Sequence, residues 1–403
     1  MKRIIALTLL LALLLCGCGN AAPAETTAAP TEATTEPTTE PTTVPTEPPV
    51  YYNPLNGEIL DAPFTGRLHA HTISNMAENM PHVNLVKADV VMEMYANMNN
   101  IVRCLALYSD IASVEAIGST RSTRPIFNDI CQHYDLILSH AGGSDTALSD
   151  ATNRGVEHFN IEAWEVQEVV TTSYRDKEYR RSLENSLFGI GSGIKAYAEA
   201  QGWPMEMERD YGFRFAEDGN GTPVDGEWAD RIDLTFVYKQ AKKDTDMVYD
   251  RELGKYVWHQ YNKEMTDQIT GEKEAFTNVI YMQTNITNNG IYHAADFVAG
   301  GTGYYANGGK IIPITWTCAD EDSAFEFFTQ NGEPLLMGQG NTYIAICTPE
   351  SPITWEGSAP VEETVPAETV MEPAAVEAVA EAAAEPAPAE VVVDETMLEE
   401  AGG

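Results

Sequence analysis

The chain has 403 residues, 43% of them hydrophobic, and its 61 acidic residues against 24 Lys and Arg give a formal net charge of −37. This composition supports at least one sizeable core, which excludes the fibrous and fully disordered classes. The acidic field repels phosphate backbones and anionic headgroups, so we expect no nucleic-acid partner.

Residues 1–18 have the order of a secretory signal, in which two basic residues precede an apolar run too short to span a membrane. The end of the run is similar to a bacterial lipobox, with Leu15 at −3, Gly17 at −1 and Cys18 at +1. We therefore expect cleavage before Cys18, lipidation of its thiol and anchoring to the extracytoplasmic face of the cell membrane. The alternatives are ordinary cleavage with free secretion, and lipidation of Cys16.

Two segments of biased composition flank the body of the chain. Residues 19–52 are rich in Thr, Pro and Glu, which predicts an extended tether. Residues 356–403 are rich in Ala, Glu, Val and Pro, with thirteen acidic and no basic residues, which predicts a disordered acidic tail.

The range 53–215 mixes both kinds of secondary structure. Asp89–Ala96 alternates between two faces and Ile101–Tyr108 is a β-rich run, so the two predict a hairpin around the turn-prone residues 97–100. A helix over Leu85–Met98 is the competing interpretation.

Three further elements are predicted in the same range. The DLILS sequence at Asp135–Ser139 indicates a buried strand, and a helix is expected from Asp145. A second helix is expected over Lys195–Gln201, with Ser192 as its cap and Gly202 as its stop.

The range 228–350 is typical of a β-rich domain, and the Pro- and Gly-bearing stretch before it is the expected join. Turn clusters separate its β-branched and aromatic runs. The runs are DLTFVY, KYVWHQY, FTNVIYMQTNI, KIIPITWTC and NTYIAICT. We therefore expect an α+β protein: a mixed α/β N-terminal domain followed by a β-rich C-terminal domain.

Four blocks of the body carry a family resemblance. They are NPLNGE at Asn53–Glu58, GSTRSTRPIF at Gly118–Phe127, HAGGSDTAL at His140–Leu148, and the block from KIIPITWT to NTYIAI at Lys310–Ile346. Together they resemble the YerB-like lipoprotein family, a two-part domain of unknown function (3048) from Gram-positive bacteria. The resemblance implies an exported, membrane-tethered α/β protein with a separate β-rich domain, and it implies no reaction.

The chain departs from the family pattern in two places. Residues 67–89 read RLHAHTISNMAENMPHVNLVKAD, without the Arg-Pro and Gln-Ser-Gly stretches of the family. After Arg175-Asp176 the chain keeps Asn185 but lacks the family's His.

One group of residues has the chemistry of an anion site. Two arginines three residues apart can present paired guanidinium donors, and a Gly-Gly-Ser turn at the start of a helix can aim backbone amides outward. The predicted ligand-binding residues are Arg121, Arg124, His140, Gly142, Gly143 and Ser144. The alternative is that the arginines pair with Asp129 or Asp110 and that Ser144 only caps its helix.

Other chemistry has weaker support. Ser144 with His140 as base lacks the Gly-x-Ser-x-Gly elbow, so no catalytic residue is predicted. His69 and His71, near His82 and Glu78, lack diagnostic ligand spacing, and we expect neither a metal nor a cofactor.

The glycine-rich residues 300–310 lack the P-loop pattern and predict a β-hairpin. No C-x-x-C pair is present among the cysteines of the body, which are either buried thiols or, for Cys318 and Cys347, partners on neighbouring strands.

We expect a non-enzymatic lipoprotein that displays a binding module outside the membrane. Its ligand would be an anionic small molecule, a peptide or a cell-wall component. Two alternatives belong to other classes: an extracytoplasmic hydrolase of wall or peptide substrates, and an assembly scaffold whose acidic tail engages basic partners.

Overall fold

The computed structural model describes residues 49–97, 101–176, 178, 182–239, 241–289 and 292–360. The predicted signal peptide with Cys18, nearly all of the predicted tether, and the tail beyond residue 360 lie outside the described residues.

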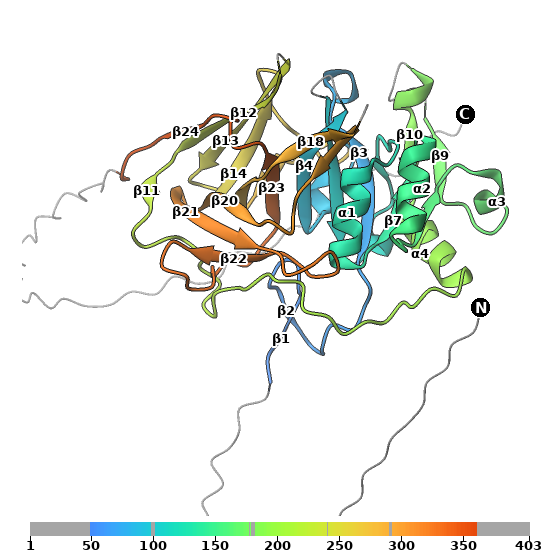
Figure 1. Cartoon of the computed structure of the whole chain (residues 1–403), viewed down its shortest axis with the longest axis horizontal. Helices are drawn as coiled ribbons and strands as arrows, with labels where there is room; N and C mark the ends of the chain where they lie inside the picture. The colour runs from blue at the N-terminus through green and yellow to red at the C-terminus, as the bar shows by residue number, and fades with distance from the viewer. Residues whose placement is uncertain are drawn as a thin grey trace, which may run out of the picture. The chain divides into compact units, whose positions relative to one another are not determined.

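One large sheet organises the described part of the chain (Figure 1). Its strand order is β11 (Glu227–Trp228), β21 (Lys310–Thr317), β20 (Gly301–Asn307), β17 (Asn278–Gln283), β23 (Thr342–Cys347), β4 (Val90–Asn97), β5 (Ile101–Tyr108), β3 (His69–Ser74), β7 (Ile137–His140) and β8 (His158–Asn160), and β22 (Glu326–Thr329) pairs with β21. Strand β23 runs parallel to both β17 and β4. The two ranges expected as separate domains therefore share this sheet, and they meet where β23 pairs with β4.

Four smaller sheets surround it. The larger of them has the order β15 (Lys263–Glu264), β14 (Lys255–Gln260), β13 (Ala241–Asp250), β12 (Arg231–Tyr238) and β24 (Ile353–Glu356), with β16 (Ala275–Phe276) against β14. The others are β6 (Ile117–Gly118), β10 (Leu187–Gly189) and β9 (Ser173–Arg175); β1 (Tyr51–Tyr52) and β2 (Ile59–Leu60); and β18 (Ile286–Asn289) and β19 (Tyr292–Ala295).

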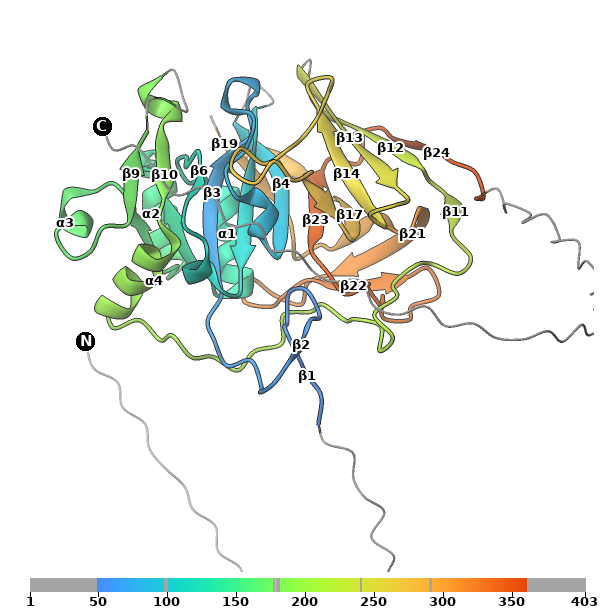
Figure 2. The ribbon, with the colours of Figure 1, turned by 180° about the vertical axis from the view of Figure 1, so that it is seen from behind.

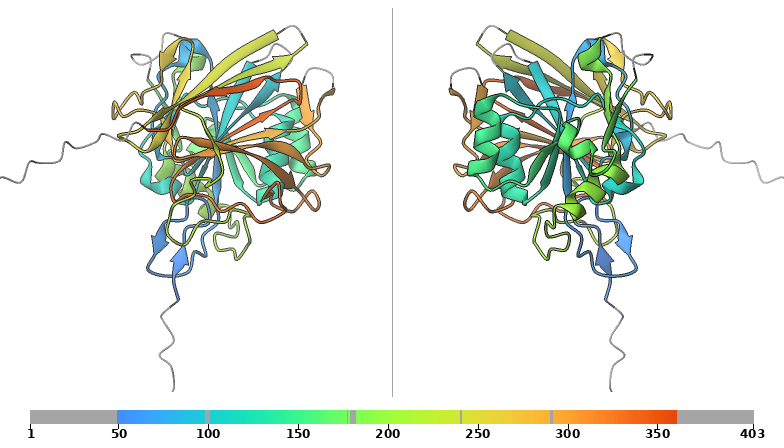
Figure 3. Two further views of the ribbon diagram at one scale, coloured as in Figure 1. Left: turned by 90° about the vertical axis from the view of Figure 1, so that its left-hand side faces the viewer. Right: turned by 90° about the vertical axis from the view of Figure 1, so that its right-hand side faces the viewer.

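Helices are few and short. They are α1 (Pro125–Tyr134), α2 (Asp145–Asn153), α3 (Trp164–Gln167) and α4 (Gly191–Ala200), with 3-10 turns η1 (Ala77–Asn79), η2 (Leu85–Lys87), η3 (Ile111–Ser113) and η4 (Leu183–Asn185). Views from the two ends show α1 and α2, in teal, to one side of the strands (Figure 3). The fold is mostly β with some helices, which confirms the α+β class predicted from the sequence.

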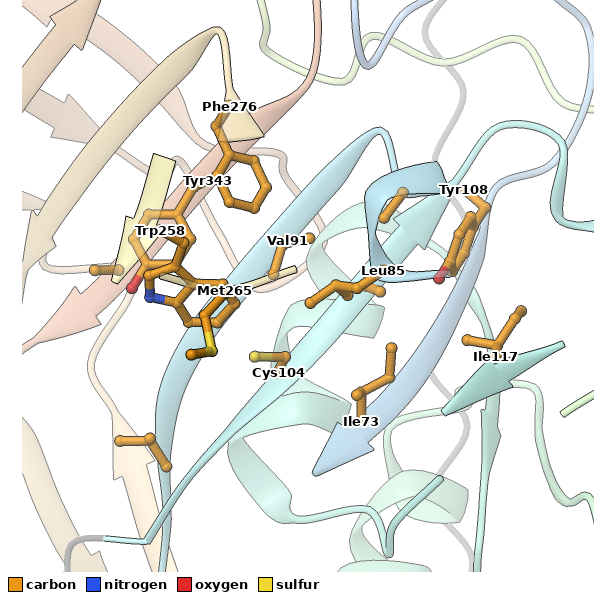
Figure 4. Close-up of a cluster of buried hydrophobic side chains, with 14 of the residues drawn as sticks. Ile73, Leu85, Val91, Cys104, Tyr108, Ile117, Trp258, Met265, Phe276 and Tyr343 are labelled. Atoms are coloured by element: carbon orange, nitrogen blue, oxygen red, sulfur yellow. The ribbon is translucent and has the colours of Figure 1, made fainter. Parts of the chain in front are cut away.

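The large sheet is buried on both faces. Alternate residues of a strand point to opposite faces, so Val91 and Tyr95 of β4 join one core while Met92 and Met94 join the other. The first core receives Trp258 and other residues of the second sheet, and the second core receives residues of α1. Figure 4 shows the first core, in which side chains from both halves of the chain lie together.

The predicted hairpin is confirmed, because β4 and β5 pair antiparallel over most of their length. The competing helix over Leu85–Met98 is wrong, since only the single turn η2 forms there. A strand is favoured because residues 90–96 are all buried, which requires apolar side chains on both faces.

The helix expected over Lys195–Gln201 begins earlier than predicted, at Gly191, and Ser192 does not cap it. The N-cap is Ile190, without a side-chain hydrogen bond. A Cβ at Gly191 would lie 1.9 Å from the carbonyl oxygen of Ile111, so glycine here lets the helix start against the neighbouring backbone.

Strand β13 was not predicted from its polar sequence AKKDTDMVYD. Its alternation is visible in the structure, where Lys243, Thr245 and Met247 are buried and their neighbours are more exposed. A lysine at an inward position concealed this period-two pattern.

That lysine pairs with a buried carboxylate in the large sheet. The Nζ of Lys243 lies 2.5 Å from Oε1 of Glu93 on β4, and Glu93 is fully buried. Asn75 Nδ2 donates to the same oxygen over 2.6 Å, and Tyr343 OH of β23 donates to the other oxygen. The Glu93 carboxylate thus accepts hydrogen bonds from several parts of the chain at the β23–β4 junction.

The ammonium group of Lys243 is itself well enclosed. It donates to Oε1 of Gln260 over 2.8 Å and lies 5.7 to 5.8 Å from the ring centroids of Phe236, Trp258 and Tyr261. Ring faces attract a cation, so these contacts help to replace its lost hydration.

Replacing Lys243 by methionine should lower the free energy of unfolding by about 3 to 5 kcal/mol, because the buried Glu93 carboxylate loses its counter-charge. Urea denaturation measures the change. The matched control is Lys242→Met, an exposed neighbour on the same strand, which should change stability by less than about 0.5 kcal/mol. Equal effects of the two substitutions would contradict a stabilising role for the buried pair.

Candidate functional site

Arginine side chains gather around a cavity of about 300 Å³. Most of its lining residues come from β5, from the segment between β6 and α1, and from the surroundings of β9 and β10. Strands β9 and β10 pair and lie side by side in Figure 2. They are Arg103, Thr120, Arg121, Ser122, Arg124, Ala141, Glu162, Arg175, Glu184 and Leu187. We call this cavity the arginine pocket.

Strand register positions Arg103. It lies on β5 directly opposite Met94 of β4, so it shares the sheet face that packs against α1. Its sequence context, IVRCLALY, is otherwise strongly apolar. The strand therefore places the charged side chain of Arg103 on the sheet face that α1 covers.

Backbone hydrogen bonds hold Arg121 between two strands. Its N–H donates to Thr72 O over 3.0 Å, and its own carbonyl accepts from Ala141 N–H over 3.0 Å. The chain then enters α1 with Arg124 at the N-cap and Pro125 at the first helical position. The two arginines thus emerge from either end of a short, firmly held segment.

Two of the four arginines are paired with carboxylates at the rim. Arg121 Nη1 lies 3.3 Å from Glu184 Oε2, whose side chain is 78% exposed, and Arg175 pairs with Glu162. The other two have no carboxylate within ion-pair distance among the described residues. The lining therefore carries a net charge of +2.

The two remaining arginines make neutral contacts. Arg103 donates to Ser122 O over 2.7 Å, and Arg124 donates to Thr123 O over 2.7 Å while its guanidinium lies 5.1 Å from the ring centroid of Tyr292. Within the described part of the chain, the buried Nε atoms of Arg103, Arg121 and Arg124 have no hydrogen-bond partner.

Arg103 is the most unusual of these groups, because only 8% of the residue is exposed. Burial, followed by repulsion from Arg124 and Arg121, lowers the pKa of Arg103 to about 9. Burial also lowers the pKa of Arg124. The described residues therefore leave uncompensated positive charge at the lining of this cavity, an arrangement that favours a bound anion.

A chain of hydrogen bonds lies behind one wall of the pocket. Thr120 Oγ1 and His71 Nε2 are 2.8 Å apart, and His71 Nδ1 lies 2.7 Å from Ser139 Oγ, which donates to Ala70 O. His71 Nδ1 is thus the donor to Ser139, and Nε2 accepts from Thr120. Burial, followed by the nearby His140, lowers the pKa of His71 to about 3, which agrees with a neutral ring.

The structure places two of the six predicted ligand residues at the arginine pocket and the other four outside its lining. Arg121 and Arg124 line the arginine pocket, whereas His140, Gly142, Gly143 and Ser144 are not among its lining residues. Ring stacking holds His140 against His158, with 3.0 Å between Nε2 and Nδ1. Burial, followed by His158, lowers the pKa of His140 to about 3.

The Gly-Gly-Ser turn has a structural use. Ser144 Oγ accepts from Ala147 N–H over 3.1 Å and caps α2. Gly142 has a φ of +68°, and its carbonyl accepts from Thr123 N–H. The turn therefore supports the segment that carries the arginines.

The structure shows where the carboxylates and the histidines lie that the sequence suggested as alternatives. Asp129 pairs with Arg154, and among the described residues neither Asp129 nor Asp110 forms an ion pair with Arg121 or Arg124, so both suggested pairings are wrong. Glu184 takes that place for Arg121. His69 and His71 are buried on β3, and the described residues contain no cluster of three or more His, Cys, Asp or Glu able to hold a metal.

The cysteines of the body are free and buried. They are Cys104, Cys131, Cys318 and Cys347. Strands β20 and β17 separate β21, which ends just before Cys318, from β23, which carries Cys347. The suggested placement on neighbouring strands is therefore wrong. The predicted hairpin over residues 300–310 is confirmed, formed by β20 and β21.

Two larger hollows lack this uncompensated charge. One, of about 860 Å³, is lined by three lysines and five acidic residues, among them Lys273 and Asp250, which pair at 2.9 Å. The other, of about 610 Å³, lies between the turns at residues 220–225 and 329–336 and is largely apolar. Of these three cavities of the described residues, the arginine pocket is the one whose lining has a net positive charge.

Comparison with known proteins places the chain in a family. Residues 57–204 match the N-terminal domain, and residues 232–344 the C-terminal domain, of the protein family of unknown function DUF3048. The chain belongs to the YerB-like DUF3048 family. YerB of Bacillus subtilis (strain 168), which is named as a lipoprotein, is 23% identical over 269 residues, covering 64% of this chain and 78% of YerB.

A solved structure shares the fold. The crystal structure of the YerB protein from Bacillus subtilis matches with a TM-score of 0.62 at 21% identity, covering 75% of this chain and 99% of that one. The family assignment thus confirms the resemblance seen in the sequence, and the lipoprotein name of the relative supports a lipoprotein of unknown function. In the described residues, no helix has the length and apolarity needed to cross a membrane.

Sequence reasoning missed Arg103 and the glutamates of the rim. Arg103 had a local signal, since it is the one charged residue within the apolar run of Ile101–Tyr108. Glu162 and Glu184 had none, because each lies more than 35 residues beyond Arg124 in the chain.

Replacing Arg103 by methionine should leave the free energy of unfolding unchanged or raise it by up to about 2 kcal/mol, because a buried and repelled cation is replaced by an apolar side chain. Urea denaturation in dilute chloride buffer measures this. Lys243→Met, by contrast, is expected to lower the free energy of unfolding. A loss above about 2 kcal/mol would show that Arg103 serves the fold rather than a ligand.

Proposed function

We propose that this protein is a lipid-anchored, extracytoplasmic binding protein that holds an anionic ligand in the arginine pocket. The observation that carries the proposal is Arg103, a nearly buried guanidinium without a carboxylate partner among the described residues. It lies beside Arg121 and Arg124, which add to the same positive field. An incoming anion would supply the charge that the lining lacks.

The energetics favour a ligand-binding role over a structural one. A buried charge without a partner destabilises a fold, and such groups persist mainly where they serve function. The chain is strongly acidic overall, so carboxylates for pairing are abundant. Positive charge kept in one cavity of such a chain is therefore best explained by a bound anion.

The membrane anchor rests on other evidence. The apolar N-terminal run, the Leu-Cys-Gly-Cys sequence and the lipoprotein name of the relative all support it. Two acyl chains are what stable anchoring requires. The Thr- and Pro-rich residues 19–52 would then hold the folded part away from the membrane surface.

A hydrolase receives no support from Ser144 and His140. Ser144 Oγ is used as a helix cap, and the hydrogen-bonded neighbour of His140 is His158. The scaffold alternative depends on the tail beyond residue 360, outside the described residues.

Isothermal titration calorimetry of the full-length chain with sulfate, inorganic phosphate and benzoate in low-salt buffer tests the binding role. At least one anion should bind, and Arg124→Gln should weaken it by about 10- to 100-fold, as expected for loss of a charge-assisted contact. The control is Arg214→Gln, a surface arginine paired with Asp210 outside the pocket. Failure of all three anions to bind would contradict the proposal.

Metabolic labelling with a radioactive fatty acid tests the anchor. Label should follow the wild-type chain and disappear in Cys18→Ala, because the acceptor thiol is lost. Cys16→Ala is the matched control and should retain the label. Label that survives Cys18→Ala would refute this site of lipidation.

A further inference from the structure

The charge of the arginine pocket specifies more than the sign of its ligand. Its rim carboxylates balance two of the four arginines, and Arg103 and Arg124 remain without a counter-charge among the described residues. A singly charged anion would leave one positive charge of the lining uncompensated. An anion of charge −2 balances the lining completely.

The pocket also has the size and the donors for a compact oxyanion. At about 300 Å³ it lies at the lower end of ligand-site volumes, enough for one oxyanion group and a small substituent. Guanidinium groups bind phosphate oxygens through paired N–H donors, and they enter this cavity from separate elements, with Arg103 on β5 and Arg175 on β9. Donors on several sides suit a tetrahedral anion better than a flat carboxylate.

We propose that the arginine pocket selects a phosphate group in its dianionic form, as a monoester or as inorganic phosphate, and that Glu184 competes with this group for Arg121. This inference rests on the proposed anion-binding function and narrows its ligand class.

Competition by Glu184 follows from its exposure. The side chain is 78% exposed and its contact with Arg121 spans 3.3 Å, so the pair is an ordinary surface ion pair of little strength. A dianion in the pocket would attract Arg121 more strongly than this solvated carboxylate does. Removal of the Glu184 charge should therefore assist phosphate binding.

The protonation of the ligand gives phosphate binding a pH dependence that can be measured. A phosphate monoester has a second pKa of about 6, so its dianion falls to roughly a tenth of the total at pH 5. Among the described residues, the charged or titratable groups that face the ligand, or pack against those that do, are the four arginines, the rim glutamates, Tyr292 against Arg124, and His71 behind Thr120. Because burial lowers the pKa of His71 to about 3, that ring stays neutral between pH 5 and 8.

Calorimetric titration of the full-length chain with phenyl phosphate, inorganic phosphate, benzoate and sulfate from pH 5 to 8 tests the inference. Phenyl phosphate and benzoate share the ring and differ in the charged group. We expect phenyl phosphate to bind at least tenfold more tightly than benzoate at pH 7.5, and about tenfold more weakly at pH 5 than at pH 7.5. The sulfate affinity should change much less with pH, because sulfate stays a dianion over this range. Tighter binding of the ester indicates a monoester ligand, and tighter binding of the free ion indicates inorganic phosphate; both outcomes support the inference.

Glu184→Gln gives a test that does not disturb the core, since the side chain is exposed. It should tighten phenyl phosphate binding by about two- to fivefold. Glu168→Gln, an exposed glutamate outside the pocket lining, should leave the affinity unchanged. Equal affinity for benzoate and phenyl phosphate, or no gain in Glu184→Gln, would overturn the phosphate inference while leaving anion binding intact. Failure of every anion to bind would instead remove the proposed function itself.

Discussion

The fold depends on a buried carboxylate at the junction of its two halves. Glu93 lies on β4 where this strand pairs with β23 from the other end of the chain, and it is fully buried. A desolvated carboxylate is tolerated only when donors surround it, and here Lys243, Asn75 and Tyr343 supply them. Each donor comes from a different element, so the charge is satisfied only when β4, β13 and β23 are assembled together.

The arginine pocket lies on the same sheet, but its buried charge, unlike that of Glu93, lacks a counter-charge among the described residues. Arg103 of β5 lies opposite Met94, one residue from Glu93 along β4, but on the other face of the sheet. On one face a buried charge is fully paired within the protein, and on the other face a buried charge is left without a counter-charge among the described residues. The first arrangement stabilises the fold, and the second keeps binding capacity available for a ligand.

The two segments that depart from the family pattern both reach this pocket. Residues 67–89 include His71, which fixes the Thr120 hydroxyl, and the segment after Arg175 includes Glu184, which occupies Arg121. The segments that keep the pattern supply Arg121 and Arg124. Two of the four pocket arginines, Arg121 and Arg124, therefore lie in a block that carries the resemblance, whereas Arg103 lies outside the four blocks.

The amino-acid sequence by itself determined the α+β class, the β4–β5 hairpin, five strands of the second half (β12, β14, β17, β21 and β23) and two of the pocket arginines, because periodicity, turn residues and clustered charge are local signals. It misassigned the Ser192 cap and missed β13, where backbone packing and a paired inward lysine override local preference. Only the tertiary structure decided that both halves share one sheet, that Glu184 rather than Asp129 meets Arg121, and that Arg103 joins the site. Those contacts join residues far apart in the chain, and their energy depends on burial, which the sequence does not specify until the strands are ordered.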